Sequence, residues 1–129
     1  MIPDDLYYSK EHEWLRLEGD GSATIGITDH AQQELGDIVY VELPDPHAAL
    51  EADDVMGSVE SVKAVSEIFC PVGGTVTEVN ESLEDAPEVV NSDPYGEGWL
   101  IRLRLDDAGS PAATMLSAGA YEKHVASEE

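Results

Sequence analysis

Lys63 is the residue of this sequence that points most directly to chemistry. It is the only lysine or arginine in the 85 residues from Leu17 to Ile101, in a chain with six basic and 28 acidic residues. Valines flank it within residues 57–67, with small or polar residues between them. This pattern predicts two short strands that meet in a turn, with Lys63 at or near the tip.

An amine at a hairpin tip is exposed to water, and this exposure suits acylation by a separate enzyme. A Schiff-base lysine needs a pKa lowered by desolvation or by a neighbouring cation. The charges nearest to Lys63 are instead the acids Glu60 and Glu67. A surface lysine without a chemical role is the alternative, but the isolation of Lys63 in the sequence favours a chemical role.

The other residues with chemical potential form no catalytic motif. The sequence contains four histidines, His12, His30, His47 and His124. No pair of them has metal-ligand spacing on one element, and a single cysteine cannot supply a zinc site, so no metal site is predicted. A dyad of Ser61 and Lys63 would share one face of a strand, but nothing in the sequence supplies an oxyanion hole. A reactive handle without catalytic groups is typical of a carrier, not an enzyme.

The composition indicates a folded, strongly acidic protein of one domain. The chain has 129 residues, of which 42% are hydrophobic, and this is enough for a core. Its formal net charge is −22. Like charges repel one another within a compact chain unless salt screens them. We therefore expect a halophilic protein of a salt-rich cytoplasm that binds neither nucleic acid nor an anionic membrane, although an ordinary acidic protein is the alternative.

The hydrophobic pattern predicts a mainly β fold. Seven strands are expected, at residues 14–17, 23–27, 38–43, 55–62, 65–69, 74–79 and 99–105. Seven short strands separated by frequent turns indicate a small sandwich or barrel. Two helices are expected, one capped by Thr28 or Asp29 that ends at Gly36, and one over residues 115–126. Cys70 is expected to be buried, and residues 127–129 are expected to fray.

Several segments resemble the lipoyl-bearing H protein family of the glycine cleavage system. They are YSKEHEW at residues 8–14, ATIGITDHAQQELG at residues 23–36, DIVYVELP at residues 37–44, ESVKA at residues 60–64 and NSDPYGEGW at residues 91–99. The resemblance covers nearly the whole chain. The combination of segments is far more specific than the pentapeptide around Lys63 alone.

The resemblance implies a fold and an attachment site. The fold is a lipoyl/biotinyl-domain-like flattened barrel of two small sheets, with a short internal helix and a C-terminal helix. It implies one domain over residues 1–129, with a lipoyl-binding core at 22–104 and a C-terminal helical segment at 112–127. Lys63 would carry one covalently bound lipoate per chain. The attachment motif would consist of Glu60, Ser61, Val62 and Ala64 around Lys63.

The resemblance also implies a role and partners. A non-catalytic carrier would shuttle the aminomethyl group of glycine on a swinging lipoyl-lysine arm. The glycine decarboxylase (P protein) would load the arm, and the aminomethyltransferase (T protein) would unload it. Dihydrolipoamide dehydrogenase (L protein) would reoxidise the dithiol, and a lipoate ligase or lipoyltransferase would attach the lipoate.

Members of this family hold the loaded arm against their own surface, and a carboxylate-lined cleft suits an aminomethyl cation. The motif positions make Glu13, Glu67 and Glu34 the candidates for this cleft, with Glu11 nearby. For each of them, an ordinary solvated acid is the alternative. His47 stands where relatives carry glycine, and histidine tolerates unusual turn backbone better than most residues.

Two rival carriers remain open at the sequence level. A biotin carrier shares the fold, but biotin attachment motifs resemble Met-Lys-Met, whereas Val62 and Ala64 flank Lys63. A lipoyl carrier that relays lipoate to other complexes is compatible with the same motif.

The charge predicts that stability depends on salt. Raising the salt concentration from low to about 1 M shortens the screening length to about 3 Å. The melting temperature should therefore rise more than that of a near-neutral relative, by about 4 °C for each kcal/mol of repulsion removed. Thermal denaturation at several salt concentrations measures this rise, and an unchanged melting temperature contradicts the repulsion argument.

Overall fold

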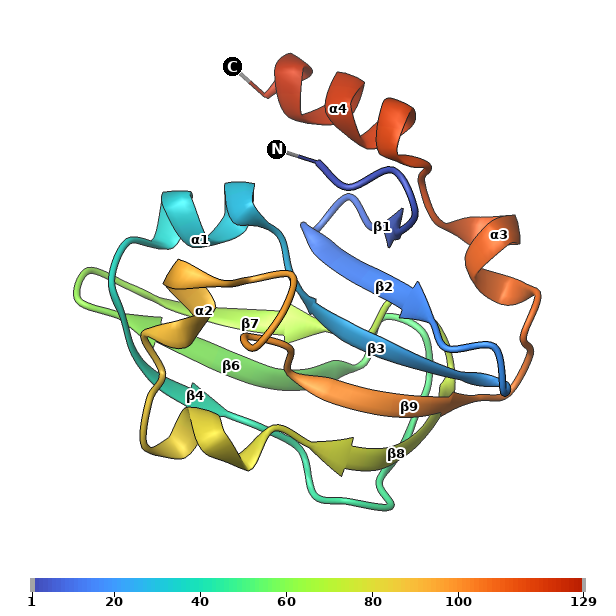
Figure 1. Ribbon diagram of the computed structural model, residues 1–129, viewed down its shortest axis with the longest axis horizontal. Helices are drawn as coiled ribbons and strands as arrows, with labels where there is room; N and C mark the ends of the chain where they lie inside the picture. Colours follow the sequence, from blue (N-terminus) through green and yellow to red (C-terminus); the bar gives the residue numbers. More distant parts are fainter. Residues whose placement is uncertain (1, 129) are drawn as a thin grey trace.

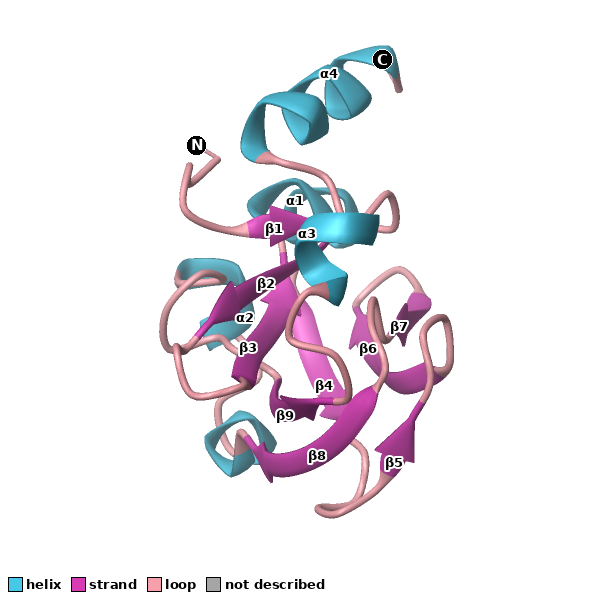
Figure 2. Cartoon of the chain, turned by 90° about the vertical axis from the view of Figure 1, so that its right-hand side faces the viewer, coloured by secondary structure: helices cyan, strands magenta, loops and turns pink. Residues whose placement is uncertain are grey.

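A computed structural model describes residues 2–128 and shows two facing β-sheets with short helices at their ends (Figures 1 and 2). The strands are β1 (Tyr7–Tyr8), β2 (Glu13–Leu17), β3 (Ser22–Ile27), β4 (Ile38–Glu42), β5 (Ala49–Leu50), β6 (Val55–Ser61), β7 (Val65–Phe69), β8 (Gly74–Val79) and β9 (Ile101–Leu105). The helices are α1 (Asp29–Leu35), the 3₁₀ helix η1 (Glu81–Glu84), α2 (Val89–Ser92), α3 (Ser110–Thr114) and α4 (Ala118–Ser127).

The two sheets enclose one main core. The larger sheet has the order β1-β2-β3-β9-β8-β5, and the smaller has the order β4-β6-β7. Leu15, Ile25 and Leu103 from the larger sheet and Val59 from the smaller sheet belong to one fully buried cluster. Leu103 and Val59 alternate with more exposed neighbours along β9 and β6, as expected for a sheet with one wet face, whereas β3 is buried on both faces. The predicted mainly β architecture of two sheets is confirmed.

The first helix follows its sequence signals closely. The Thr28 side chain caps α1 by accepting a hydrogen bond from the Ala31 amide. Gly36 ends the helix with a φ of 84°, and its N–H donates to the Gln32 carbonyl. A positive φ favours glycine, so both ends of α1 are determined by local residue type.

The C-terminal region differs from the sequence expectation. The helix predicted from residue 115 begins only at Ala118, with Ser117 as its cap. Leu116 is extended and pairs with Tyr8 through two backbone hydrogen bonds, which attach this segment to the larger sheet. Tyr121 then stacks on Tyr8, with ring centroids 4.6 Å apart. The apolar character of residues 115 and 116 therefore reflects packing rather than helical periodicity.

The structure also contains short strands, and an ordered C-terminal end, that the sequence did not predict. The two-residue strands β1 and β5 are too short to show a period. Ser127 belongs to α4, and the Glu128 carboxylate lies 3.0 Å from ring nitrogens of His12 and His124, so the expected fraying at these two positions is not observed. Residue 129 lies outside the described residues. His47 has a φ of 75°, an unusual left-handed turn backbone that histidine tolerates better than most residues.

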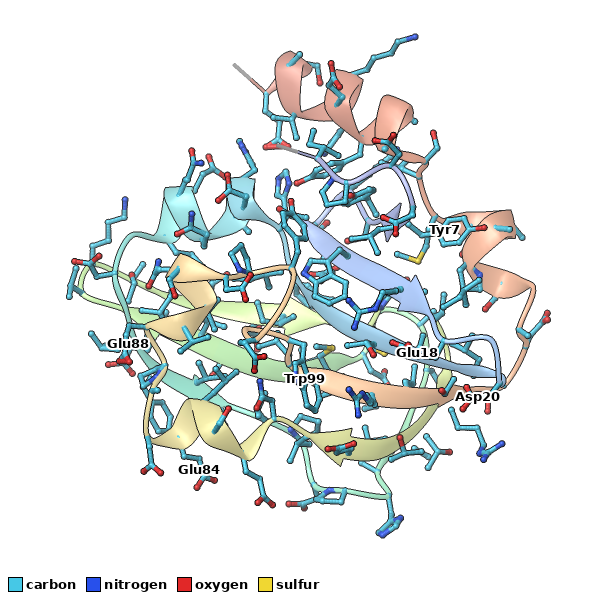
Figure 3. The ribbon with its side chains drawn as sticks, viewed as in Figure 1. Tyr7, Glu18, Asp20, Glu84, Glu88 and Trp99 are labelled. Atoms are coloured by element: carbon cyan, nitrogen blue, oxygen red, sulfur yellow. The ribbon has the colours of Figure 1, made fainter. Side chains whose placement is uncertain are left out.

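Most of the acidic side chains project into solvent. Figure 3 shows Glu84 and Glu88 pointing away from the ribbon, and both are exposed. No described helix is both long enough and apolar enough to span a membrane.

Candidate functional site

Lys63 occupies the exposed tip of the β6–β7 hairpin. Its flanking valines, Val62 and Val65, keep 71% and 66% of their surface accessible. The lysine stem passes over the end of α1, because a Cβ at Gly36 would lie 3.6 Å from Lys63 Cε. The Val62 amide donates to the Asp37 carbonyl at 3.1 Å, which fixes the base of the tip against the turn that follows α1.

Ser61 builds the turn that presents Lys63. Its hydroxyl oxygen accepts hydrogen bonds from the amides of Lys63 and Ala64, at 3.3 and 3.1 Å, and its hydroxyl lies 3.2 Å from the Ala64 carbonyl. The Ser61 amide donates to the same carbonyl at 2.8 Å. Only 5% of Ser61 is exposed. The hydroxyl is therefore committed to the backbone of the tip and is poorly placed to act as a nucleophile.

Strand β7 leads from the tip to a buried carboxylate on the other sheet. The Phe69 amide, at the far end of β7, donates to Oε2 of Glu13 at 3.4 Å. The Ser9 hydroxyl donates to Oε1 of Glu13, and the Ser9 oxygen accepts a hydrogen bond from the Glu13 amide. Glu13 is only 2% exposed, so these contacts supply most of the solvation of its carboxylate.

Burial changes the acidity of this carboxylate. Loss of water raises the pKa of Glu13 from 4.5 to about 7, although the hydrogen bonds from Ser9 and Phe69 act in the opposite direction. The nearby charges of Glu11 and Asp53 raise the pKa further. A cation placed against Glu13 would meet a negative potential in a dry surrounding.

A cleft of about 490 Å³ opens beside Glu13. Its walls are Ser9, Lys10, Glu11, Glu13, Ala52, Asp53, Phe69, Cys70, Pro71, Val72, Gly73, Ser110, Thr114, Met115 and Leu116. The lining combines apolar side chains with three acids, Glu11, Glu13 and Asp53. The cleft can thus accept an apolar chain that ends in a positive charge.

The three candidate acids occupy three different places. Glu13 lines the cleft, whereas Glu67 is exposed on β7, between the tip and Phe69 in the chain, and borders a different hollow with Val55 and Val65. Glu34 lies on α1 beside His30, 3.3 Å from its Nε2 atom, and does not line the cleft. Among the motif residues, Glu60, Val62 and Ala64 are exposed.

The structure adds residues that sequence reasoning did not select. Ser9 and Phe69 hold the Glu13 carboxylate, and Cys70 lies in the wall of the cleft with no exposed surface. Burial raises the pKa of the Cys70 thiol to about 11, and its Sγ atom lies 3.1 Å from the Val72 carbonyl. The four-residue spacing of Ser9 and Glu13 did not predict their hydrogen bond, because a loop and not a helix brings the Ser9 hydroxyl to the Glu13 carboxylate.

Comparison with known proteins finds similarity to one family over nearly the whole chain. The family model for the glycine cleavage H-protein matches residues 6–128. The glycine cleavage system H protein of Rubrobacter xylanophilus is 56% identical over 128 residues, which cover 99% of this chain and 98% of that protein. The H protein of Salinibacter ruber is 57% identical over 119 residues, 92% of this chain and 94% of that protein. A crystal structure of a glycine cleavage system H protein from Mycobacterium marinum superposes with a TM-score of 0.88 at 36% identity and covers 97% of this chain and 99% of that one.

The raised pKa of Glu13 predicts a pH dependence of stability. The folded state holds this proton more tightly than the unfolded chain does, so stability should fall as the pH rises from 4.5 to 7 and then level off. A shift of this size corresponds to about 3 kcal/mol. Urea denaturation of Glu13→Gln across this range should show a flatter profile than the parent protein. Ser9→Ala removes a hydrogen bond that lowers the pKa, so its stability should go on falling to a higher pH than that of the parent protein. Parallel profiles for all three proteins contradict the assignment.

Proposed function

We propose that Lys63 bears a lipoyl group, because this chain belongs to the glycine cleavage H-protein family. Proteins of this family are the lipoate-carrying component of the glycine cleavage system. The observation that carries this proposal is the built hairpin tip. Ser61 and the turn after α1 fix the backbone around Lys63 and leave its amine accessible to a modifying enzyme. A lipoate ligase or lipoyltransferase would form the amide bond.

The other partners follow from membership of the system. We propose that the glycine decarboxylase loads the arm, the aminomethyltransferase unloads it and dihydrolipoamide dehydrogenase reoxidises it. When bound, the dithiolane supplies the sulfur that carries the aminomethyl group. The chain itself acts as a non-catalytic carrier, with residues 22–104 as its lipoyl-binding core and residues 112–127 as a C-terminal segment that is helical except around Leu116.

The geometry of β7 supports docking of the arm on the protein itself. Twelve bonds separate Lys63 Cα from a dithiolane sulfur, which gives an extended reach of about 14 Å at about 1.2 Å per bond. The six steps from Lys63 to Phe69 span at most about 20 Å. An arm that follows β7 from the tip therefore reaches about as far as Glu67, and the loaded aminomethyl group adds about 3 Å toward Phe69 and its partner Glu13.

The exposed edge of β7 also offers hydrogen-bond donors along this path. The Phe69 amide faces away from β6, because it donates to Glu13. Alternate amides of a strand point the same way, so the amides of Val65 and Glu67 face the same edge. They can donate to the amide carbonyl of a lipoyl-lysine. The arm would then extend the sheet by contacts that do not depend on its load.

Glu13 is the residue that we propose for recognising the load. An ammonium group at the end of the arm would meet a carboxylate that is almost fully buried and held by two hydrogen bonds. Such charge-assisted bonds contribute about 1.5–3 kcal/mol. The oxidised arm carries no cation, so Glu13 should matter little before loading. Glu67 would contribute less, because its exposed carboxylate interacts through water.

Mass spectrometry tests the attachment site. Protein isolated from its native cells should carry one lipoyl group per chain, at Lys63. Lys63→Arg should fold normally and lose all carrier activity, because arginine keeps the charge but is not acylated in this way. Lys123→Arg is the matched control and should stay lipoylated. Biotin at Lys63, or lipoate at Lys10 or Lys123, contradicts the proposal.

Decay of the loaded protein tests the cleft. Glu13→Gln keeps the shape of the side chain and removes its charge, so the aminomethyl group should be lost to water about 10- to 100-fold faster. Glu67→Gln should accelerate the loss by no more than about fivefold, and Glu88→Gln, a distant exposed acid, should have no effect. Release of ammonia and formaldehyde measures the rate. Unchanged decay in the Glu13→Gln/Glu67→Gln double variant would show that the cleft contacts lie elsewhere.

A further inference from the structure

Four side chains from three separate parts of the chain converge beside α1. His12 comes from the loop between β1 and β2, His30 and Glu34 lie one turn apart on α1, and Glu128 follows α4. One ligand atom from each lies within 4.8 Å of the other three. We propose that these residues bind a divalent transition-metal ion of the zinc class.

The distances between the donor atoms suit a four-coordinate ion. His12 Nε2 lies 3.0 Å from a carboxylate oxygen of Glu128. His30 Nε2 lies 3.3 Å from Glu34 and 3.9 Å from Glu128. A tetrahedral ion with bonds of about 2.0–2.1 Å places its ligand atoms about 3.3 Å apart. Movements of less than about 1 Å would bring these atoms into a coordination shell.

His30 is the residue that most needs such an ion. Its Nε2 atom is shielded from water and makes no hydrogen bond, even though the Glu34 carboxylate is close. A buried polar atom without a partner is unfavourable and uncommon in folded proteins. A metal ion at the convergence point would satisfy the Nε2 lone pair.

The surrounding residues orient the proposed ligands. His12 Nδ1 lies 2.8 Å from the Tyr121 hydroxyl, which lies 2.7 Å from the Thr28 hydroxyl. When Nδ1 carries its proton and donates it to Tyr121, the Nε2 lone pair is free for a metal. The His12 backbone has a φ of 71°, an uncommon conformation for a non-glycine residue. The ring of this residue contributes a nitrogen to the cluster. A polar partner on the second ring nitrogen is typical of metal-bound histidine.

His124 orients the fourth ligand. Its Nε2 atom lies 3.0 Å from Oε2 of Glu128 and 3.1 Å from the Lys10 carbonyl. Because the carbonyl only accepts, this nitrogen carries a proton and can also donate to the carboxylate. Glu128 is thereby aimed at His12 and His30, although it stands beyond the last residue of α4.

The ligand set selects the class of ion. Two imidazoles and two carboxylates suit Zn²⁺ and its transition-metal neighbours, whereas Mg²⁺ and Ca²⁺ prefer oxygen ligands alone. A bound ion would join α1, α4 and the β1–β2 loop. It would also offset the repulsion between Glu34 and Glu128. This site shares no residue with the β7 edge or with the cleft beside Glu13, although His12 belongs to the same loop as the cleft residue Glu11.

Metal titration tests the proposal on chelator-treated full-length protein. With millimolar Mg²⁺ present to occupy oxygen-only sites, calorimetry should show one Zn²⁺ bound per chain, and the melting temperature should rise with Zn²⁺. Co²⁺ at the same site should give the visible absorption of a tetrahedral ion. His30→Gln and Glu34→Gln should each weaken Zn²⁺ binding at least about 10-fold. His47→Asn, at a remote exposed histidine with a left-handed backbone, should bind Zn²⁺ like the parent protein.

Two outcomes overturn the proposal. One is the absence of a Zn²⁺-dependent change in the parent protein. The other is equal affinity in the parent, His30→Gln and Glu34→Gln proteins, which would place the ion on other surface carboxylates. Glu34 keeps 60% of its side-chain surface exposed, so Glu34→Gln should fold and decides the question even if His30→Gln does not. None of these measurements uses the lipoyl group.

Discussion

A buried carboxylate joins the two sheets of this protein. Glu13 belongs to β2 of the larger sheet, and its oxygen accepts the Phe69 amide from the edge of the smaller sheet. Without this acceptor, the Phe69 amide would be an unpaired donor at an open edge. The contact fixes where β7 lies against β2, and therefore where the far end of the hairpin lies relative to Lys63. The Glu13 carboxylate thus both links the two sheets and provides a negative charge that can bind a cation.

Local signals in the sequence were sufficient for the hairpin around Lys63 and for α1. The valine pattern placed the tip correctly, and Thr28 and Gly36 marked both ends of the helix, because caps and positive φ angles are determined by residue type. The C-terminal helix was predicted to begin too early in the chain. Leu116 is apolar, but it is extended and pairs with Tyr8 and does not belong to the helix.

The sites depend on tertiary contacts that spacing does not reveal. One buried acid cannot be distinguished from 27 others by composition, and Glu13 was selected through the family resemblance. Its separation from Glu67 became visible only with the sheets in place. The histidine cluster had a partial signal, because His30 with Glu34 and His124 with Glu128 are both spaced by four residues. Their meeting with His12 depends on the way α4 packs over Tyr8.

The burial of Cys70 has a consequence for redox chemistry. Thiol–disulfide exchange begins with attack by a thiolate, and the thiol of Cys70 is shielded from solvent with its pKa raised to about 11. It is also the only cysteine of the chain. A dithiolane resting in the neighbouring cleft would therefore find no competent sulfur on its own protein to form a mixed disulfide. The two sulfurs of the arm would form a disulfide only with each other, and an external oxidoreductase would accept the electrons. The carrier would then remain available for another cycle.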